Sequence, residues 1–195
     1  MLEATSQRET GAVHDCLPKA FRDHGVLAER TRQLDEPHVA PLNDWVRGLR
    51  QRLGPTAIVP WFDPADGGTN ARILWLLEAP GPKSTRERGG SGIISCDNND
   101  GAAENTWRTR REAGVDRADV VHWNVIPYYI GTDTKVRAWR PGDVANAGPM
   151  LVELVALLPR LRAVILGGKA AQAAWRDYGP SRPTIREFPC PHPSV

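Results

Sequence analysis

Four polar groups follow, or lie within, the apolar runs of this sequence. Glu78 follows ILWLL, and Asn124 lies within VVHWNVI. A Gly-Gly-Lys turn (167–169) follows AVIL, and His192 follows TIREF within PCPHPS. A carboxylate, an amide and an imidazole can donate, accept or transfer protons, so this set could bind and transform a polar ligand.

Two of these groups stand out because their surroundings are unusual. Asn124 interrupts an apolar strand, where an amide costs about 1–3 kcal/mol unless it is hydrogen-bonded. It is therefore either a structural buried amide or a group that reads a ligand. The Gly168-Lys169 pair is not a P-loop, because positions 163 and 170 are both alanine. It remains a helix N-terminus that could contact a phosphate.

The elements that would position these groups alternate along the chain. Apolar runs predict strands, of which the first three are covered on both faces, at 73–77, 120–126, 163–166 and 184–188. Apolar spacing predicts helices at 42–53, 102–113, 143–158 (started or kinked by Pro149) and 169–178. Because parallel strands need long crossovers, we expect an α/β fold: a three-layer α/β/α sandwich around a central four-stranded parallel sheet.

We expect one domain over residues 1–195. Its N-terminal part (1–55) is predicted to be helical, weakly so over the first forty residues, and 71–195 forms the α/β core. The stretch 60–70 is rich in Pro, Gly, Asp and Asn and is predicted to be a long ordered loop. Ligands of open parallel sheets bind beyond the carboxyl ends of the strands, so the four polar groups should converge on one rim.

Composition excludes several classes of protein. No apolar run approaches the ~18 residues that span a bilayer, and the first residues lack the apolar segment of a secretory signal. Cys16, Cys96 and Cys190 are too few and too far apart for a disulfide framework or an iron–sulfur cluster. We therefore expect a cytoplasmic protein with reduced cysteines, without contact to a membrane.

Charge is unevenly distributed. Residues 1–70 carry 8 basic and 10 acidic side chains, whereas residues 71–195 carry 17 and 13. Arginine suits phosphate, but arginine-rich surfaces are often only solvated, so charge alone does not decide whether the partner is a nucleic acid.

Four elements follow one another in this order: EAPGP, a strand with an internal Asn, LGGKAAQ and HPS. Together they resemble the uracil-DNA glycosylase superfamily, closest to its bacterial GEAPG-type and related branches. The likeness spans roughly residues 71–195. It implies a hydrolase of base-excision repair that cleaves the N-glycosidic bond of uracil, or a related deaminated base, in DNA. Such enzymes flip the nucleotide into a pocket or act on single strands. The expected partner is uracil-containing DNA, single- or double-stranded, and the expected state is a monomer.

The resemblance also implies roles for individual residues. Asn124 would read O4 and N3 of uracil, Glu78 would orient water or stabilise the cationic sugar, and His192 would donate to the developing anion at O2. The implied substrate-binding residues are Ala79, Pro80, Gly81, Pro82, Ile94, Ser95, Asn124, Gly168, Lys169 and Ser194.

The sequence departs from the family pattern in several places. Leu77 stands where a glycine usually precedes the glutamate. Residues 93–95 are Ile-Ile-Ser where an aromatic residue that stacks on the base is expected, so either an aliphatic residue packs there or Trp123 or Tyr128 supplies the ring. The iron–sulfur cysteines are missing, so no metal or cofactor is expected. The chain ends one residue after HPS, where similar proteins continue with a wedge loop, so we expect a truncated C-terminus.

Two alternatives remain open. One is a non-catalytic member of the same fold that binds uracil or single-stranded DNA. The other is an α/β hydrolase that acts on a free nucleotide or nucleoside. Base release from an oligonucleotide distinguishes the glycosylase from both.

Overall fold

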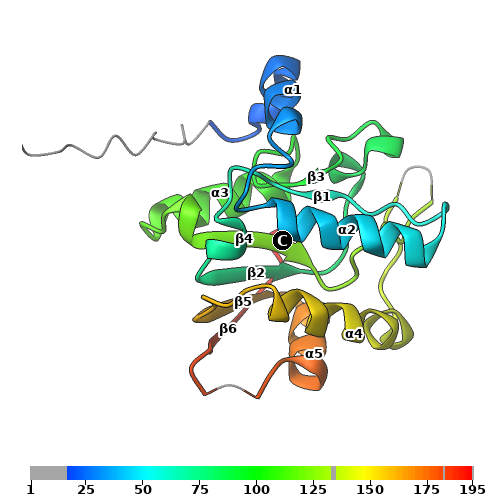
Figure 1. The fold of residues 1–195 in the computed structure, drawn as a ribbon, viewed down its shortest axis with the longest axis vertical. Helices are drawn as coiled ribbons and strands as arrows, with labels where there is room; N and C mark the ends of the chain where they lie inside the picture. Colours follow the sequence, from blue (N-terminus) through cyan, green and yellow to red (C-terminus); the bar gives the residue numbers. More distant parts are fainter. Residues whose placement is uncertain (1–16, 133–134, 182, 195) are drawn as a thin grey trace, which may run out of the picture.

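The computed structural model describes residues 17–132, 135–181 and 183–194. The start of the predicted helical segment, and Cys16 with it, lies outside these residues. Four parallel strands form the central sheet in the order β4-β2-β5-β6 (Figure 1). Their bounds are β2 (Ile73–Leu77), β4 (Val120–Asn124), β5 (Ala163–Gly167) and β6 (Arg186–Cys190). The predicted α/β fold with a central four-stranded parallel sheet is therefore confirmed.

The last strand differs from its prediction. The apolar pattern placed it at 184–188, but β6 covers Arg186–Cys190, with Ile185 buried just before it. β6 is an edge strand, and Phe188 at its centre is 50% exposed. An edge strand needs no continuous apolar run and tolerates Pro189, which lacks a backbone donor, so hydrophobicity did not mark its bounds.

The described residues form five α-helices: α1 (His24–Arg32), α2 (Ala40–Leu53), α3 (Gly101–Glu112), α4 (Pro141–Ala156) and α5 (Lys169–Tyr178). Asp23 and Asp100 cap α1 and α3 by accepting hydrogen bonds from backbone N–H groups of the first turn. Pro149 lies inside α4 rather than at its start, because the helix begins at Pro141. Trp45 and Arg52 of α2 donate to Glu153 of α4 across 2.7 and 2.6 Å, so these two helices lie side by side.

The segment 60–70 is more structured than the predicted loop. Within it, β1 (Trp61–Phe62) pairs in parallel with β3 (Ile93–Ile94) as a second, two-stranded sheet. The chain from 62 to 68 is buried, and Gly67 is needed where it passes β4: a Cβ there would lie 2.0 Å from the carbonyl oxygen of Ala118. The Pro, Gly and Asp content marked an irregular segment, but not its burial.

The two faces of β4 have different chemistry. Trp123 packs into the core, where its ring stacks on Phe62 with 3.8 Å between centroids and 10° between planes. Because side chains alternate along a strand, His122 and Asn124 project to the opposite face. None of the helices in the described ranges is long and apolar enough to cross a bilayer.

Candidate functional site

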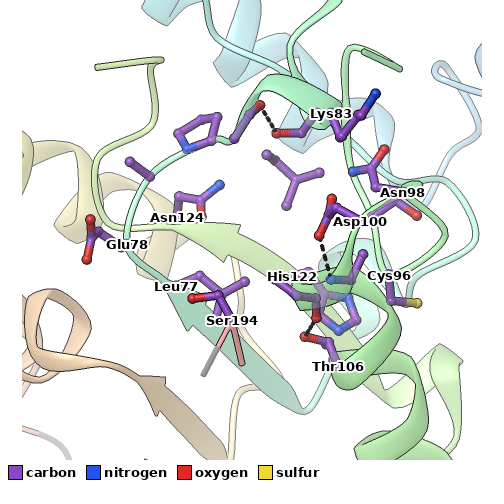
Figure 2. Close-up of a pocket in the computed structure, with 18 of the residues that line it drawn as sticks. Leu77, Glu78, Lys83, Cys96, Asn98, Asp100, Thr106, His122, Asn124 and Ser194 are labelled. Carbon is purple, nitrogen blue, oxygen red and sulfur yellow. Dashed lines mark hydrogen bonds between the residues drawn. The ribbon is translucent and has the colours of Figure 1, made fainter. Parts of the chain in front are cut away.

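A cavity of about 640 Å³ opens where β2 and β4 end (Figure 2). Most of the residues predicted from the sequence line it. They are Glu78, Ala79, Pro80, Gly81, Pro82, Ile94, Ser95, Asn124, His192 and Ser194. The predicted rim is thus a physical cavity that joins segments more than one hundred residues apart.

Asn124 is the most buried of the predicted polar groups, with 4% of its surface exposed. It is the last residue of β4 and pairs with Leu77 of β2. Beyond it, the backbone N–H groups of Val125 and Ile126 donate to the carbonyls of Leu77 and Glu78. Its carboxamide has no hydrogen-bond partner among the described residues and lies in the cavity wall. Because this amide lines the cavity, its donor and acceptor are available to a ligand that enters there.

Glu78 directly follows β2 and lies across Asn124 from Asp100 in the view of Figure 2. Burial raises the pKa of its carboxyl group. The turn that follows is braced by two hydroxyl groups, because Ser84 Oγ and Thr85 Oγ1 donate to the carbonyl of Gly81 across 3.0 and 2.8 Å. The glutamate therefore stands on a stiff segment at the cavity edge.

His192 has a defined tautomer. The backbone N–H of Ser194 donates to its Nδ1 across 3.2 Å, and Ser194 Oγ lies 2.7 Å from the same nitrogen. A backbone N–H can only donate, so Nδ1 accepts, and the proton of the neutral ring is on Nε2. Burial lowers the pKa of His192, partly opposed by the charge of Asp100, which favours this neutral, donating form.

Gly168 and Lys169 do not line the cavity. Lys169 is exposed at the first turn of α5. Gly168 instead supports His192: a Cβ on it would lie 3.1 Å from the Cβ of His192, and its φ of 92° suits glycine. Its N–H also donates to the carbonyl of Cys190 across 3.0 Å. The Gly-Gly turn thus positions the histidine segment, whereas the sequence predicted a phosphate contact.

The structure bears on which side chain would pack against a bound base. Of the described residues that line the cavity, none is Phe, Tyr or Trp. Ile94, 5% exposed, forms part of the wall, whereas Trp123 lies in the core and Tyr128 is not a lining residue. The aliphatic alternative is the one that the geometry favours.

Sequence reasoning missed His122, Cys96 and Thr106, which also line the cavity. His122 had one available signal, its spacing of two residues from Asn124 on one strand, which places both on the same face. Cys96 is a poor nucleophile here, because burial raises the pKa of its thiol to about 12.

A buried ion cluster, which we define as Arg30, Asp63, Asp66, Asp97 and Arg117, contacts the lining residues His122 and Ser95. Arg117 donates to all three carboxylates, at 2.7 Å from Asp63, 3.0 Å from Asp66 and 2.8 Å from Asp97. Arg30 adds contacts of 2.5 Å to Asp63 and 3.1 Å to Asp97. Two of these carboxylates come from the segment 60–70, which explains why that segment is buried.

Within the cluster, the pKa values of Asp63 and Asp97 are shifted in opposite directions. Burial works to raise the pKa of Asp63, but Arg117 and Arg30 outweigh it and lower the value to about 2. For Asp97 burial prevails and the pKa is raised. Within the described ranges, no three His, Cys, Asp or Glu side chains are grouped so as to hold a metal ion. Neither a protein-family model nor a curated protein matches the chain.

Proposed function

We propose that this protein is a DNA glycosylase that hydrolyses the N-glycosidic bond of uracil, or of a related deaminated base, in DNA as a step of base-excision repair. The observation that carries the proposal is the unpartnered carboxamide of Asn124, buried in a cavity whose edge holds Glu78 and His192. The resemblance of EAPGP and HPS to the uracil-DNA glycosylase superfamily supports the same assignment.

Asn124 suits the edge of uracil. Its amide offers one acceptor and two donors, which pair with the N3–H donor and the O4 acceptor of the base. Cytosine has the reverse pattern at these positions and would leave the amide mispaired in the orientation that suits uracil, so selectivity requires that the bound carboxamide does not rotate by 180°. Such mispairing gives strong discrimination, since an unpaired buried polar group costs more than a lost contact.

The reaction is a displacement at C1′ of the sugar. Water adds its oxygen to C1′ and gives up one proton, the C1′–N1 bond breaks, and its electron pair leaves on the base, with charge at O2. The released proton is finally taken up by the base anion, so the products are the free base and the abasic sugar. The Nε2–H of neutral His192 would donate to O2, and Glu78 would orient the water or stabilise the positive charge on the sugar. Neither step requires a metal or organic cofactor.

The wider setting follows from this proposal. We infer a single domain arranged as a three-layer sandwich, with α2, α4 and α5 on the face of the sheet that carries Trp123 and α3 on the face that carries His122. It would act as a monomer in the cytoplasm. The DNA strand would run past the turn 79–82 and Ser194, where backbone N–H groups and a hydroxyl could contact phosphates.

One observation favours a second candidate. The described lining residues include no aromatic side chain, and such a ring normally contributes ~1–3 kcal/mol by stacking on the base. A non-catalytic module that holds uracil or single-stranded DNA through Asn124 would need less precise placement of the base.

Base release separates the two candidates. A single-stranded oligonucleotide with one deoxyuridine is incubated with the protein and then treated with alkali, which cleaves at an abasic site. Glu78→Ala and His192→Ala are run beside the matched surface variants Glu112→Ala and His24→Ala, whose side chains are exposed. Cleavage that only the first pair abolishes supports the glycosylase. Binding without cleavage by the wild type would support the non-catalytic module.

A further inference from the structure

A second, smaller cavity of about 240 Å³ has two arginines in its wall. We call it the side pocket. It is lined by Arg50 from the last turn of α2, by Trp61 of β1 with the residues before it, and by the segment 85–87. The proposed reaction uses none of these side chains, so the pocket needs a role of its own.

Arg50 presents one end of its guanidinium group to the side pocket. Its Cζ lies 3.7 Å from the centroid of the Trp61 ring. Nε donates to the carbonyl of Val59 across 2.9 Å, and Nη2 donates to the same oxygen. Nη1 has no hydrogen-bond partner among the residues that the structure describes. The ring and the carbonyl therefore fix the group while one of its donor nitrogens stays available.

Arg86 lines the side pocket from a different segment of the chain. Its side chain packs on Gly92, where an added Cβ would lie 3.2 Å from the Cβ of Arg86 and 3.4 Å from its Nε. The φ of Gly92, 79°, is in the left-handed region that favours glycine. Arg86 is exposed and forms no hydrogen bond or ion pair within the described ranges. Two arginines without carboxylate partners thus share one pocket.

The charges around the pocket favour an anion. Burial lowers the pKa of Arg50; the charge of Glu87 opposes this shift, whereas those of Arg47 and Arg86 add to it. Arg47 is itself paired with two exposed aspartates. Two arginines and one glutamate leave the lining with a surplus of one positive charge. The planar fork of arginine matches the oxygens of a phosphate group.

The side pocket lies close to the first cavity. Ser84 lines the first cavity and Arg86 lines the side pocket, so these two residues are at most about 7 Å apart along the chain. Thr85 between them is buried and donates to the carbonyl of Gly81 across 2.8 Å, which fixes the segment. A volume of about 240 Å³ holds one phosphate group and a few waters of about 30 Å³ each.

We propose that the side pocket is a phosphate-binding site in which Arg50 and Arg86 hold one phosphate group between them. The group belongs either to the DNA strand whose base enters the first cavity or to a small phosphate compound. The short distance between the two cavities favours the strand. That source rests on the proposed function, whereas the site itself does not. A contact of this kind sets the register of the strand without reading a base.

The strand is tested with a single-stranded oligonucleotide that carries one deoxyuridine on a 2′-fluorinated sugar, which slows glycosidic cleavage. Fluorescence anisotropy gives its Kd between about 50 and 200 mM salt. Arg86→Gln should weaken binding about five- to ten-fold at the lower salt concentration. It should also reduce the log–log slope of affinity against salt by about 0.7, the value for one phosphate contact on a single strand.

An uncharged methylphosphonate linkage, moved along the same oligonucleotide, locates the phosphate. At one position it should weaken binding to the wild type by a similar factor. At that position it should leave binding to Arg86→Gln unchanged, because the variant has already lost the contact. Losses that are the same in both proteins at every position would show that Arg86 holds none of the phosphates.

Arg160→Gln is the matched control. It removes the same charge from an exposed residue that precedes β5, at the opposite end of the strands from the first cavity. It should change neither the affinity nor the salt slope. Arg50→Gln should reproduce the effect of Arg86→Gln. If circular dichroism shows that Arg50→Gln does not fold, because Arg50 also binds the carbonyl of Val59, Arg86→Gln alone decides.

Inorganic phosphate tests the other source. The Tm is compared in sodium phosphate and in sodium chloride at equal pH and ionic strength, because a ligand of the folded state raises it. A rise that Arg86→Gln removes, with unchanged binding of the oligonucleotide, assigns the site to small phosphate compounds. The inference is overturned if Arg86→Gln matches the wild type in both assays, or if Arg160→Gln loses as much affinity as Arg86→Gln.

The outcomes also separate this inference from the proposed function. Release of uracil by the wild type, with both assays unchanged in Arg86→Gln, would leave the glycosylase intact and remove the phosphate site. Weaker binding to Arg86→Gln, without release of a base by the wild type, would retain the phosphate site and remove the hydrolysis.

Discussion

The carboxamide of Asn105 donates to the carbonyl of Pro193 across 2.7 Å and so ties helix α3 to the segment that carries His192. Arg108, one turn later on α3, donates to the other end of the same carboxamide across 2.8 Å. From the opposite side, Gln172 of α5 donates to Cys190 across 3.1 Å. The imidazole is therefore held in the cavity by contacts from two helices rather than by its own strand alone.

The first prediction concerns the hydrogen bond from Asn105 to the carbonyl of Pro193. Asn105→Leu should lower kcat of base release about 10- to 100-fold with a small change in KM, because a misplaced His192 loses its alignment with O2. Single-turnover kinetics on a deoxyuridine oligonucleotide would measure the effect. In a His192→Ala background the same substitution should add little; two independent, additive losses would show that Asn105 does not act through His192.

The second prediction concerns the pH dependence of Glu78. Burial raises the pKa of this carboxyl group above its ordinary 4.5, and in the proposed mechanism its ionised form is the active one. Activity should therefore fall as pH decreases through that raised value, at a higher pH than for an exposed glutamate. A pH profile of kcat/KM measures this limb. Glu78→Gln should have little activity and no such limb, and a limb that persists in the variant would assign it to another group.

The third prediction concerns the protonation of His192. Because burial lowers its pKa, the ring should remain neutral down to a pH below 6.5. The imidazole C–H resonances, followed by NMR against pH with His192→Ala for assignment, would show the titration. His192→Ala should lower kcat by about 10²–10³, as expected for loss of one donor to a developing anion. Titration above 6.5 would contradict the neutral-donor role.

The fourth prediction concerns the ion cluster. Asp63→Ala should destabilise the protein by about 3–5 kcal/mol, because it removes the one carboxylate that contacts both buried guanidinium groups through separate oxygens and leaves their charge less well compensated. Chemical denaturation would measure the change. Asp44→Ala, which removes an exposed partner of Arg47, is the control and should have little effect.

The same cluster predicts a pH window for stability. The pKa of Asp63 is about 2 in the folded state against an ordinary 3.8, so its contribution is fully present above 3.8 and is lost as pH falls toward 2. Asp63→Asn should remove this part of the acid dependence. If wild type and variant lost stability in parallel over that range, Asp63 would not be the group responsible.

Much of the framework could be predicted from the sequence, because its signals are local. β2 and α5 have the bounds that apolar runs and helical spacing predicted. The meeting of Glu78, Asn124 and His192 followed from one rule of topology, the convergence of parallel strand ends.

The remainder depends on contacts between distant segments, which leave little local signal. The sequence predicts that Asp63 and Asp66 are loop residues. Only the folded structure shows that both contact Arg117 and that Asp66 also contacts His122. Lys169 was predicted to contact substrate because it follows a Gly pair, yet its side chain is exposed outside the cavity. Local composition gives the type of a segment but not the neighbours that the fold supplies.

The alternation along β4 makes recognition depend on register. Asn124 faces the cavity while its neighbour Trp123 stacks on Phe62 in the core. A slip of one residue would place an indole against the ligand and a carboxamide in the core. The aromatic stack therefore excludes that slip, and substitutions of Phe62 would be felt as lost selectivity among bases as well as lost stability. Packing on one face of the strand thus sets which chemical group is offered on the other.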